Sequence, residues 1–297
     1  MIEMSVCIPM FRCKYIAWLL FESMIRQKNI NFEWELILEE EQNDEAFGLN
    51  EILKYKNNLK KVGCVDIKYY PLEEWIPLGL KTLHLIKYCN QNSKIITYAA
   101  SDFYLPNTSF SNQYNALIDE KYDCYRSSKT IFYNIENEKI SLYDTSKNEY
   151  RGDTSERGIL LKIAREITGL KKLGRSIDKH LYLELLRITN NNLRVYENET
   201  DSWKYGFSTH GLNNLSGPNR AKRITENMIL KNYYPVNYNM EDYIPKEIIE
   251  KLKDSKQYLD KHSKELNGLI KEMDKNERRK KKRRKIKNES SSEQIMD

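Results

Sequence analysis

The sequence lacks the features that mark several common classes of protein. No apolar run approaches the ~20 residues that a membrane-spanning helix needs, and no basic leader with a cleavage site precedes the first apolar segment. The five cysteines are scattered, odd in number and form no CxxC pair, so neither a zinc site nor a disulfide scaffold is indicated. We therefore expect a cytoplasmic protein with free thiols.

Glycine-rich phosphate loops are also missing. No GxGxxG follows the first strand-like segment, and GxxxxGK[ST] occurs nowhere in the chain. Dinucleotide binding and P-loop chemistry therefore lack the backbone cradle that they need. A nucleotidyltransferase stays open as an alternative, although it would want a glycine- and Lys/Arg-rich loop near the N-terminus, and residues 9–14 contain no glycine.

Positive charge is concentrated at one end of the chain. The formal net charge is +6, but residues 278–287 carry nine Lys/Arg and no acid, which leaves −3 for the rest. This basic tail has three interpretations: it binds nucleic-acid phosphates, it contacts an anionic membrane, or it is a solvated, disordered end. The tail has no interleaved aromatic residues, so base stacking is not indicated.

Apolar periodicity predicts alternating strands and helices over the first hundred residues. The expected strands are 4–8, 31–38, 62–70 and 94–99, and the expected helices are 16–24, 46–59 and 79–89. Three strand–helix–strand units predict an α/β fold, a Rossmann-like and mostly parallel sheet with helices on both faces.

The pattern changes beyond Pro106. We expect helices at 108–118, 156–167 and 177–188, a hairpin within 122–144, an ordered loop at 203–216 and a long helix that starts after Pro245. That last helix is expected to dock an apolar stripe on the domain and to project the basic tail. The predicted organisation is one main domain (1–235), a C-terminal helical extension (236–277) and a basic tail, predicted to be disordered (278–297).

The most informative segment is residues 94–106, KIITYAASDFYLP. An apolar, β-prone run ends in small residues, and Asp102 follows it. In open α/β sheets the ligand crevice lies at the carboxyl edge of the strands. A carboxylate there, beside a negatively charged ligand, is most easily explained by a bridging cation. An ordinary aspartate that opens a loop is the alternative.

Together these landmarks resemble the family-2-like glycosyltransferases of the GT-A fold, over about residues 3–215. The matching segments, in the family's order, are VCIPMFRCKYIAWLLFESMIRQ, WELILEEE, YAASDFYLP, GRSIDKHLYLELL and STHGLNNLS. The resemblance implies a GT-A fold and the transfer of a sugar from a nucleotide-diphosphate donor, most simply a UDP-sugar, to a hydroxyl group.

Three motifs depart from the family pattern. Ala100-Ser101-Asp102 stands where the family has a metal-binding DxD, and Ile177-Asp178 stands where it often has Glu-Asp. The family's Arg-Asn-x-Gly is absent, which leaves Lys81 or His84 for contact with phosphate. These departures keep open a non-catalytic nucleic-acid-binding protein on a degenerate transferase fold.

The resemblance implies a set of catalytic and metal-binding residues. Asp102 and His210 would hold Mn²⁺ or Mg²⁺, with phosphates and water completing the shell. Asp178 would be the general base, giving inversion at the anomeric carbon. A hydrogen-bonded loop histidine and a carboxylate that stabilises a helix N-terminus are the structural alternatives for His210 and Asp178.

The resemblance also implies a donor site. Its residues would be Pro9, Phe11, Glu40 (or Glu39), Lys81 and Ser101. Apart from the resemblance, Lys204 or Arg220 is a candidate for contact with the diphosphate, and Trp75 and Trp203 are candidate platforms for stacking on sugars. The alternatives are solvated surface charges for the two basic residues and buried aromatics for the two tryptophans. For the acceptor, both modified DNA of a bacteriophage genome and a cell-surface or lipid-linked glycan fit a polybasic tail.

Overall fold

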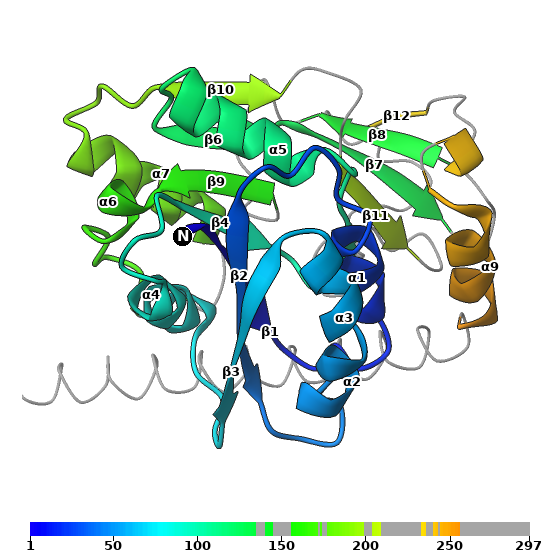
Figure 1. The fold of residues 1–297 in the computed structure, drawn as a ribbon. Helices are drawn as coiled ribbons and strands as arrows, with labels where there is room; N and C mark the ends of the chain where they lie inside the picture. Colours follow the sequence, from blue (N-terminus) through cyan, green and yellow to red (C-terminus); the bar gives the residue numbers. More distant parts are fainter. Residues whose placement is uncertain are drawn as a thin grey trace, which may run out of the picture.

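A seven-stranded sheet forms the centre of the molecule, and a smaller five-stranded sheet lies beside it (Figure 1). This computed structural model describes residues 1–134, 140–144, 156–171, 173, 177–198, 204–208, 233–235, 240–242 and 244–255. The predictions made for Trp203, His210, Arg220 and the basic tail lie outside these residues.

The main sheet is mostly parallel, as predicted. Its strands, in spatial order, are β10 (Val195–Asn198), β6 (Cys124–Ser127), β9 (Glu156–Leu160), β4 (Ile95–Ala99), β1 (Ile2–Met10), β2 (Glu33–Glu41) and β3 (Cys64–Leu72). β1 pairs in parallel with β2 and β4, β2 with β3, and β10 with β6, whereas β9 is antiparallel to both of its neighbours. The carboxyl ends of the parallel strands therefore meet at one edge.

Two apolar cores lie on the two faces of this sheet. The helices are α1 (Trp18–Met24), α2 (Leu49–Lys54), α3 (Lys56–Lys61), α4 (Leu78–Tyr88), α5 (Ser109–Tyr114), α6 (Leu161–Ala164), α7 (Ile177–Ile188) and α9 (Lys246–Asp254), with a π-helical turn at Asn115–Asp119 and a 3-10 turn at Met240–Asp242. Buried residues of α4, α6 and α7 pack on one face, and those of α1, α2, α3, α5 and α9 pack on the other. Sandwiching between helices explains why the central strands are apolar on both sides.

Two sequence predictions are wrong in part. Glu156–Leu160, expected to open a helix, is the antiparallel strand β9, and only the short α6 follows it. The strand pairs with both β4 and β6 and so closes a gap in the sheet, a long-range pairing that outweighs the local helical pattern. Lys204–Ser208, expected to lie in a loop, is strand β11 of the second sheet.

The second sheet is built from segments that are distant in the sequence. Its order is β12 (Tyr233–Pro235), β8 (Ile140–Asp144), β7 (Lys129–Asn134), β11 and β5 (Phe103–Tyr104). β7 and β8 pair antiparallel, which confirms the predicted hairpin. β5 begins four residues after the end of β4 and pairs with β11, so the intervening turn connects the two sheets.

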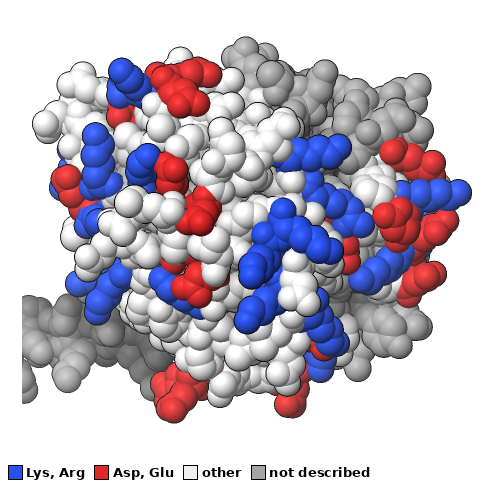
Figure 2. Space-filling view, in the orientation of Figure 1, with Lys and Arg blue, Asp and Glu red and all other residues white. Residues whose placement is uncertain are grey.

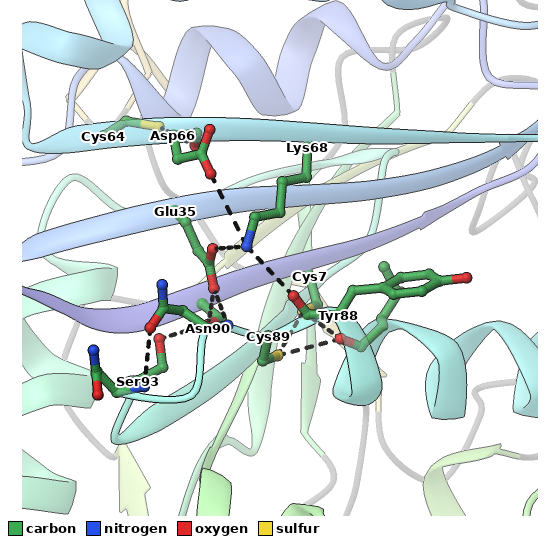
Figure 3. A network of polar contacts seen from close by, with 12 residues as sticks. Cys7, Glu35, Cys64, Asp66, Lys68, Tyr88, Cys89, Asn90 and Ser93 are labelled. Carbon is green, nitrogen blue, oxygen red and sulfur yellow. Dashed lines mark hydrogen bonds and ion pairs between the residues drawn. The ribbon is translucent and has the colours of Figure 1, made fainter.

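A buried polar network fixes the end of α4 against the sheet (Figure 3). The Glu35 carboxylate, fully buried on β2, accepts hydrogen bonds from Ser5 Oγ, the Asn90 backbone N–H and Lys68 Nζ, each at 2.6 Å. Burial lowers the pKa of Lys68, but the bond to Glu35 together with the negative charges of Glu35 and Asp66 outweighs burial, so the pKa of the amine is raised. The network therefore holds an ion pair that spans β2, β3 and the loop after α4.

The C-terminal helix α9 packs on the side of the domain formed by α1. Ile248, Ile249 and Leu252 are buried in the core, and Lys251 Nζ lies 4.0 Å from the Trp18 ring centroid. The first part of the predicted extension thus docks an apolar stripe, as expected. The predictions for residues 256–297 lie outside the described part of the chain.

The surface is charged, with both signs interspersed. On the face shown in Figure 2, the densest group of basic side chains lies over α2 and α3, whose exposed lysines include Lys54, Lys56, Lys60 and Lys61. Across the part of the chain that the structure describes, no helix combines the length and the apolar character that crossing a bilayer requires.

Replacing Glu35 with alanine is expected to lower the free energy of unfolding by about 3 kcal/mol, because it leaves Lys68 and the buried donors without their acceptor. Glu51→Ala is the matched control, since it removes an exposed ion pair with Lys54 and should cost at most about 0.5 kcal/mol. Urea unfolding measures both values. Equal losses for the two variants would contradict the structural role given to Glu35.

Candidate functional site

The candidate site lies where β1, β2 and β4 end at the same edge of the main sheet. The parallel register brings Met10 of β1 opposite Glu40 of β2. On the other side, β1 pairs with β4, which ends at Ala99 just before the turn that carries Asp102. Three segments of the chain therefore lie at this edge: the loop after β1, the acidic end of β2 and the turn after β4.

Asp102 is buried at this edge, with 6% of its surface exposed, in the turn between β4 and β5. It follows a strand in the main sheet and precedes one in the second sheet, so it lies at the junction of the two. Burial raises the pKa of the Cys13 thiol and Ser101 opposes that rise, so the same turn lies beside the loop after β1. The predicted residues Ser101 and Asp102 thus belong to a turn that is fixed on both sides.

Lys81 is buried at the start of α4 and points at the end of β1. Its Nζ donates hydrogen bonds to the Met10 carbonyl at 2.5 Å and to Glu41 Oε2 at 2.6 Å. The amine also lies 5.7 Å from the centroid of the Phe11 ring. Burial lowers the pKa of Lys81, and Glu41 opposes that fall. The structure therefore brings the predicted residues Phe11 and Lys81 together, and it adds Glu41.

A second acid–base pair lies one turn further along α4. Glu39 Oε1 is 2.8 Å from His84 Nδ1, and the carboxyl is fully buried while the imidazole is about one-third exposed. Burial raises the pKa of Glu39 despite the bond to His84. The backbone of Pro9 is paired opposite Glu39 in the β1–β2 ladder, which places all three residues at this edge.

Glu40 points to the opposite face of the sheet. Its carboxylate accepts hydrogen bonds from the backbone N–H groups of Phe47 at 2.8 Å and Gly48 at 2.9 Å, and from the Tyr69 hydroxyl at 3.0 Å. These bonds hold the loop before α2, which starts after Gly48 with a φ of 80°. The contact with a nucleotide that the sequence predicts for Glu40 stays a prediction.

The role of Glu41 was missed in the sequence, although a signal for it was present. Successive side chains of a strand point to opposite faces, so Glu39 and Glu41 share a face that Glu40 does not. Lys81 and His84 are three residues apart on one helix and so share a face as well. Comparing the alternation of the strand with the three-residue spacing of the helix would have predicted that Glu39 and Glu41 pair with Lys81 and His84.

Asp178 lies in the first turn of α7 and is partly buried. The loop before α7 is tied to the start of α4, where the Gly79 N–H donates to the Leu173 carbonyl at 2.8 Å. After α7 the chain reaches Arg194, whose carbonyl accepts from the Asp123 N–H at the start of β6. α7 therefore begins on the carboxyl side of the sheet, the side on which Asp102 lies.

The metal prediction is only partly covered by the structure. Of the two predicted ligands, Asp102 is described and His210 lies outside the described residues. Within the described ranges, no group of three or more His, Cys, Asp or Glu side chains is arranged to hold a metal ion. A divalent ion at Asp102 would therefore need ligands from its substrate, from water or from other parts of the chain.

Trp75 lies apart from these residues in the loop before α4, where 46% of its surface is exposed. The loop joins β3 to the start of α4 and so borders the same edge of the sheet. The side chain of Lys204, proposed for diphosphate contact, is not among those described. The ligand contacts predicted for Trp75 and Lys204 therefore stay predictions.

Among the comparisons with known proteins, the one with solved structures identifies the fold. No family model matches the sequence, and no curated protein matches it. Among solved structures, S. aureus TarS 1-349 matches with a TM-score of 0.53 and 16% identity, covering 69% of this chain and 60% of that one. TarS is a family-2-like glycosyltransferase with a GT-A fold.

Two ligand complexes of the same protein match equally well. TarS 1-349 in complex with UDP gives a TM-score of 0.54 at 14% identity, covering 70% of this chain and 61% of that one. The complex with UDP-GlcNAc gives 0.54 at 16% identity, covering 75% and 64%. This chain thus spans 60–64% of the length of the TarS 1-349 structures. The predicted GT-A fold is confirmed.

Replacing Gly79 with alanine is expected to destabilise the protein, because a Cβ there would lie 2.0 Å from the Leu170 carbonyl oxygen. Backbone must move to relieve this clash, so we expect a loss of about 3 kcal/mol in the free energy of unfolding. At Gly169 the nearest atom belongs to the flexible Glu184 side chain, and Gly169→Ala should cost less than about 1 kcal/mol. Urea unfolding that gives equal losses would refute this close approach.

The raised pKa of Glu39 predicts a pH dependence of stability. Between about pH 4.3, where an unfolded glutamate titrates, and its higher folded value, the native state binds more protons than the unfolded state. The contribution of Glu39 to the free energy of unfolding is therefore fully present at lower pH and is lost as the pH rises through that window. Glu39→Gln should remove this loss, measured by urea unfolding from pH 4 to 7, whereas the exposed Glu51→Gln should not. Parallel profiles for wild type and Glu39→Gln would count against the shift.

Proposed function

We propose that this protein is a glycosyltransferase that moves a sugar from a nucleoside-diphosphate donor, UDP-sugar first among them, to a hydroxyl group. The observation that carries the proposal is the buried Asp102, which follows β4 at the carboxyl edge of a GT-A sheet. Ligands bind at this edge in open α/β sheets. TarS, which has the same fold, was solved with UDP and with UDP-GlcNAc.

Asp178 is proposed as the general base. As the acceptor oxygen attacks the anomeric carbon, its proton passes to the carboxylate, and the bond from that carbon to the diphosphate oxygen breaks. Attack from the face opposite the leaving group inverts the configuration at the anomeric carbon. Asp178 lies in the first turn of α7, and a helix N-terminus is a place where negative charge is stabilised.

The leaving diphosphate needs positive charge. A Mn²⁺ or Mg²⁺ ion held by Asp102 and His210 would supply it when bound. Lys81 is a buried cation at this edge, and its amine is engaged by Glu41 and the Met10 carbonyl. We therefore assign Lys81 to holding the loop of Phe11 in place, with direct phosphate contact as its second proposed role.

Recognition of the nucleoside is proposed to involve Glu41 or Glu39. Glu40 already accepts hydrogen bonds from Phe47, Gly48 and Tyr69. By contrast, Glu39 Oε2 and Glu41 Oε1 are buried and have no hydrogen-bond partner among the described residues. A buried carboxylate oxygen needs a donor, and the hydroxyl groups of a ribose would provide one. Pro9 and Phe11 would line the adjoining base pocket, and Ser101 would complete the donor site.

The acceptor is proposed to be anionic, as the basic tail of residues 278–287 would attract such a molecule. Modified DNA and a lipid-linked or cell-surface glycan both fit this description. The tail would then raise the local concentration of acceptor without taking part in the chemistry.

Donor binding and hydrolysis test the proposal without knowledge of the acceptor. The melting temperature of the full chain is followed with UDP, UDP-GlcNAc and a GDP-sugar, with and without Mn²⁺. A bound donor at 100 times its Kd should add about 2.7 kcal/mol to stability. We expect UDP-GlcNAc to stabilise the protein and to release UDP slowly in water.

Matched variants separate binding from chemistry. Asp178→Asn should lower UDP release by about 10²–10⁴-fold while leaving donor binding unchanged. Asp102→Asn should weaken donor binding and reduce the effect of Mn²⁺. Glu51→Gln serves as the control, because Glu51 forms only a surface ion pair with Lys54. If no nucleotide-sugar stabilises the protein, or if Asp178→Asn releases UDP at the wild-type rate, this function is wrong.

A further inference from the structure

A groove of about 690 Å³ lies at the opposite edge of the main sheet from Asp102. Its wall is the end of α4 and the loop that leads from it to β4, and its other side is the segment after α6. This end of the sheet is where the strands begin: the Lys94 N–H, just before β4, donates to the Glu3 carbonyl, and the Leu161 N–H donates to Lys94. The groove is therefore separate from the proposed donor site.

The lining of the groove is rich in cations and contains no acidic residue. Lys87, Arg165 and Lys171 are exposed along it, and the side chains of Gln91 and Thr168 add further hydrogen-bond donors. One Arg165 nitrogen bonds weakly to the Asn90 carbonyl at 3.4 Å, which draws this side chain towards the α4 loop. Three positive charges match a group that only accepts hydrogen bonds and carries about two negative charges.

The floor of the groove is apolar. It is formed by Leu83 and Ile86 of α4 and by Ile167 from the opposite wall. Ile86 and Ile167 also belong to the core, with 5% and 4% of their surfaces exposed, so packing holds them in place. An apolar floor beside a cationic rim fits a ligand with a carbon body and an anionic end.

The wall next to Gln91 is held in place before any ligand arrives. The Asn90 N–H is bound to the buried Glu35 carboxylate, and the Ser93 N–H closes a turn on the Asn90 carbonyl at 3.1 Å (Figure 3). Sites with walls fixed by buried hydrogen bonds lose little entropy when they bind. This wall of the groove is thus preformed.

We propose that this groove binds one molecule of a phosphate monoester with an apolar carbon chain. The phosphate would lie among Lys87, Arg165 and Lys171, and the chain would lie on the floor of Leu83, Ile86 and Ile167. The volume lies within the range of pockets for small molecules, about 300–1,000 Å³. The site is independent of the proposed sugar transfer.

Isothermal titration of the full chain with hexyl phosphate, inorganic phosphate and hexanol tests the proposal. We expect one hexyl phosphate to bind at least tenfold more tightly than inorganic phosphate, since each buried CH₂ adds about fourfold to affinity. Hexanol should not bind measurably. Added salt should weaken the binding of both phosphates.

Variants locate the site. Lys87→Gln, Arg165→Gln and Lys171→Gln together should weaken hexyl phosphate binding at least tenfold, while the same change at Lys56, Lys60 and Lys61 of α3 should not. Leu83→Ala should reduce the preference for hexyl phosphate over inorganic phosphate. The melting curve of the triple variant shows whether that variant folds. If it does not, the single variant Arg165→Gln replaces it in the binding measurement.

Four results would overturn the proposal: equal affinity for hexyl phosphate and inorganic phosphate, unchanged binding by the Arg165→Gln variant, displacement of hexyl phosphate by UDP in a competitive manner, or binding only to vesicles that contain phosphatidic acid. The third would assign the binding to the donor edge. The fourth would make the groove part of a membrane-contacting surface.

Discussion

The position of α4 depends on three buried carboxylates of β2. Glu35, Glu39 and Glu41 project from the same face of that strand, and each meets a partner that α4, its following loop or β3 supplies: Lys68 and Asn90, His84, and Lys81. A buried carboxylate without a partner lowers the stability of the fold. All of these pairs form together only when α4 has one position along the sheet and one rotation about its own axis. Apolar packing alone would permit the helix to slide, because it is not directional. The acids therefore fix a position that the core only favours.

The local part of this architecture was predictable from the sequence. Strands β1 to β4 and the helices between them follow from apolar runs and periodicities that each need only neighbouring residues. β9 was not predictable in the same way, because the pattern of residues 156–167 is compatible with a helix and only pairing with β4 and β6 selects the strand. In the second sheet the β7–β8 hairpin was predictable, but β5 was not: it is two residues long, has no sequence signal of its own and exists because it pairs with β11, about one hundred residues later.

The candidate site shows the same division between local and distant information. An acid after β4 was found because a strand end and a carboxylate are adjacent in the chain, and Asp102 is indeed buried at the carboxyl edge. The choice among Glu39, Glu40 and Glu41 needed the partners on α4 and in the loop before α2, which lie elsewhere in the sequence. Burial alone does not identify the ligand contact, since all three are buried, but Glu40 is satisfied by backbone donors and the other two retain a buried oxygen with no described partner.

One helix serves both ends of the main sheet. α4 has 11 residues and is about 16 Å long, with Lys81 and His84 towards the proposed donor site and Ile86 and Lys87 in the basic groove. A rigid helix transmits a signal between two sites only if it has two arrangements of similar free energy. Sliding α4 would break its buried pairs with Glu39 and Glu41 together, so a second arrangement is disfavoured by several kcal/mol. The groove is therefore better suited to retaining a molecule near the protein than to switching the proposed sugar transfer.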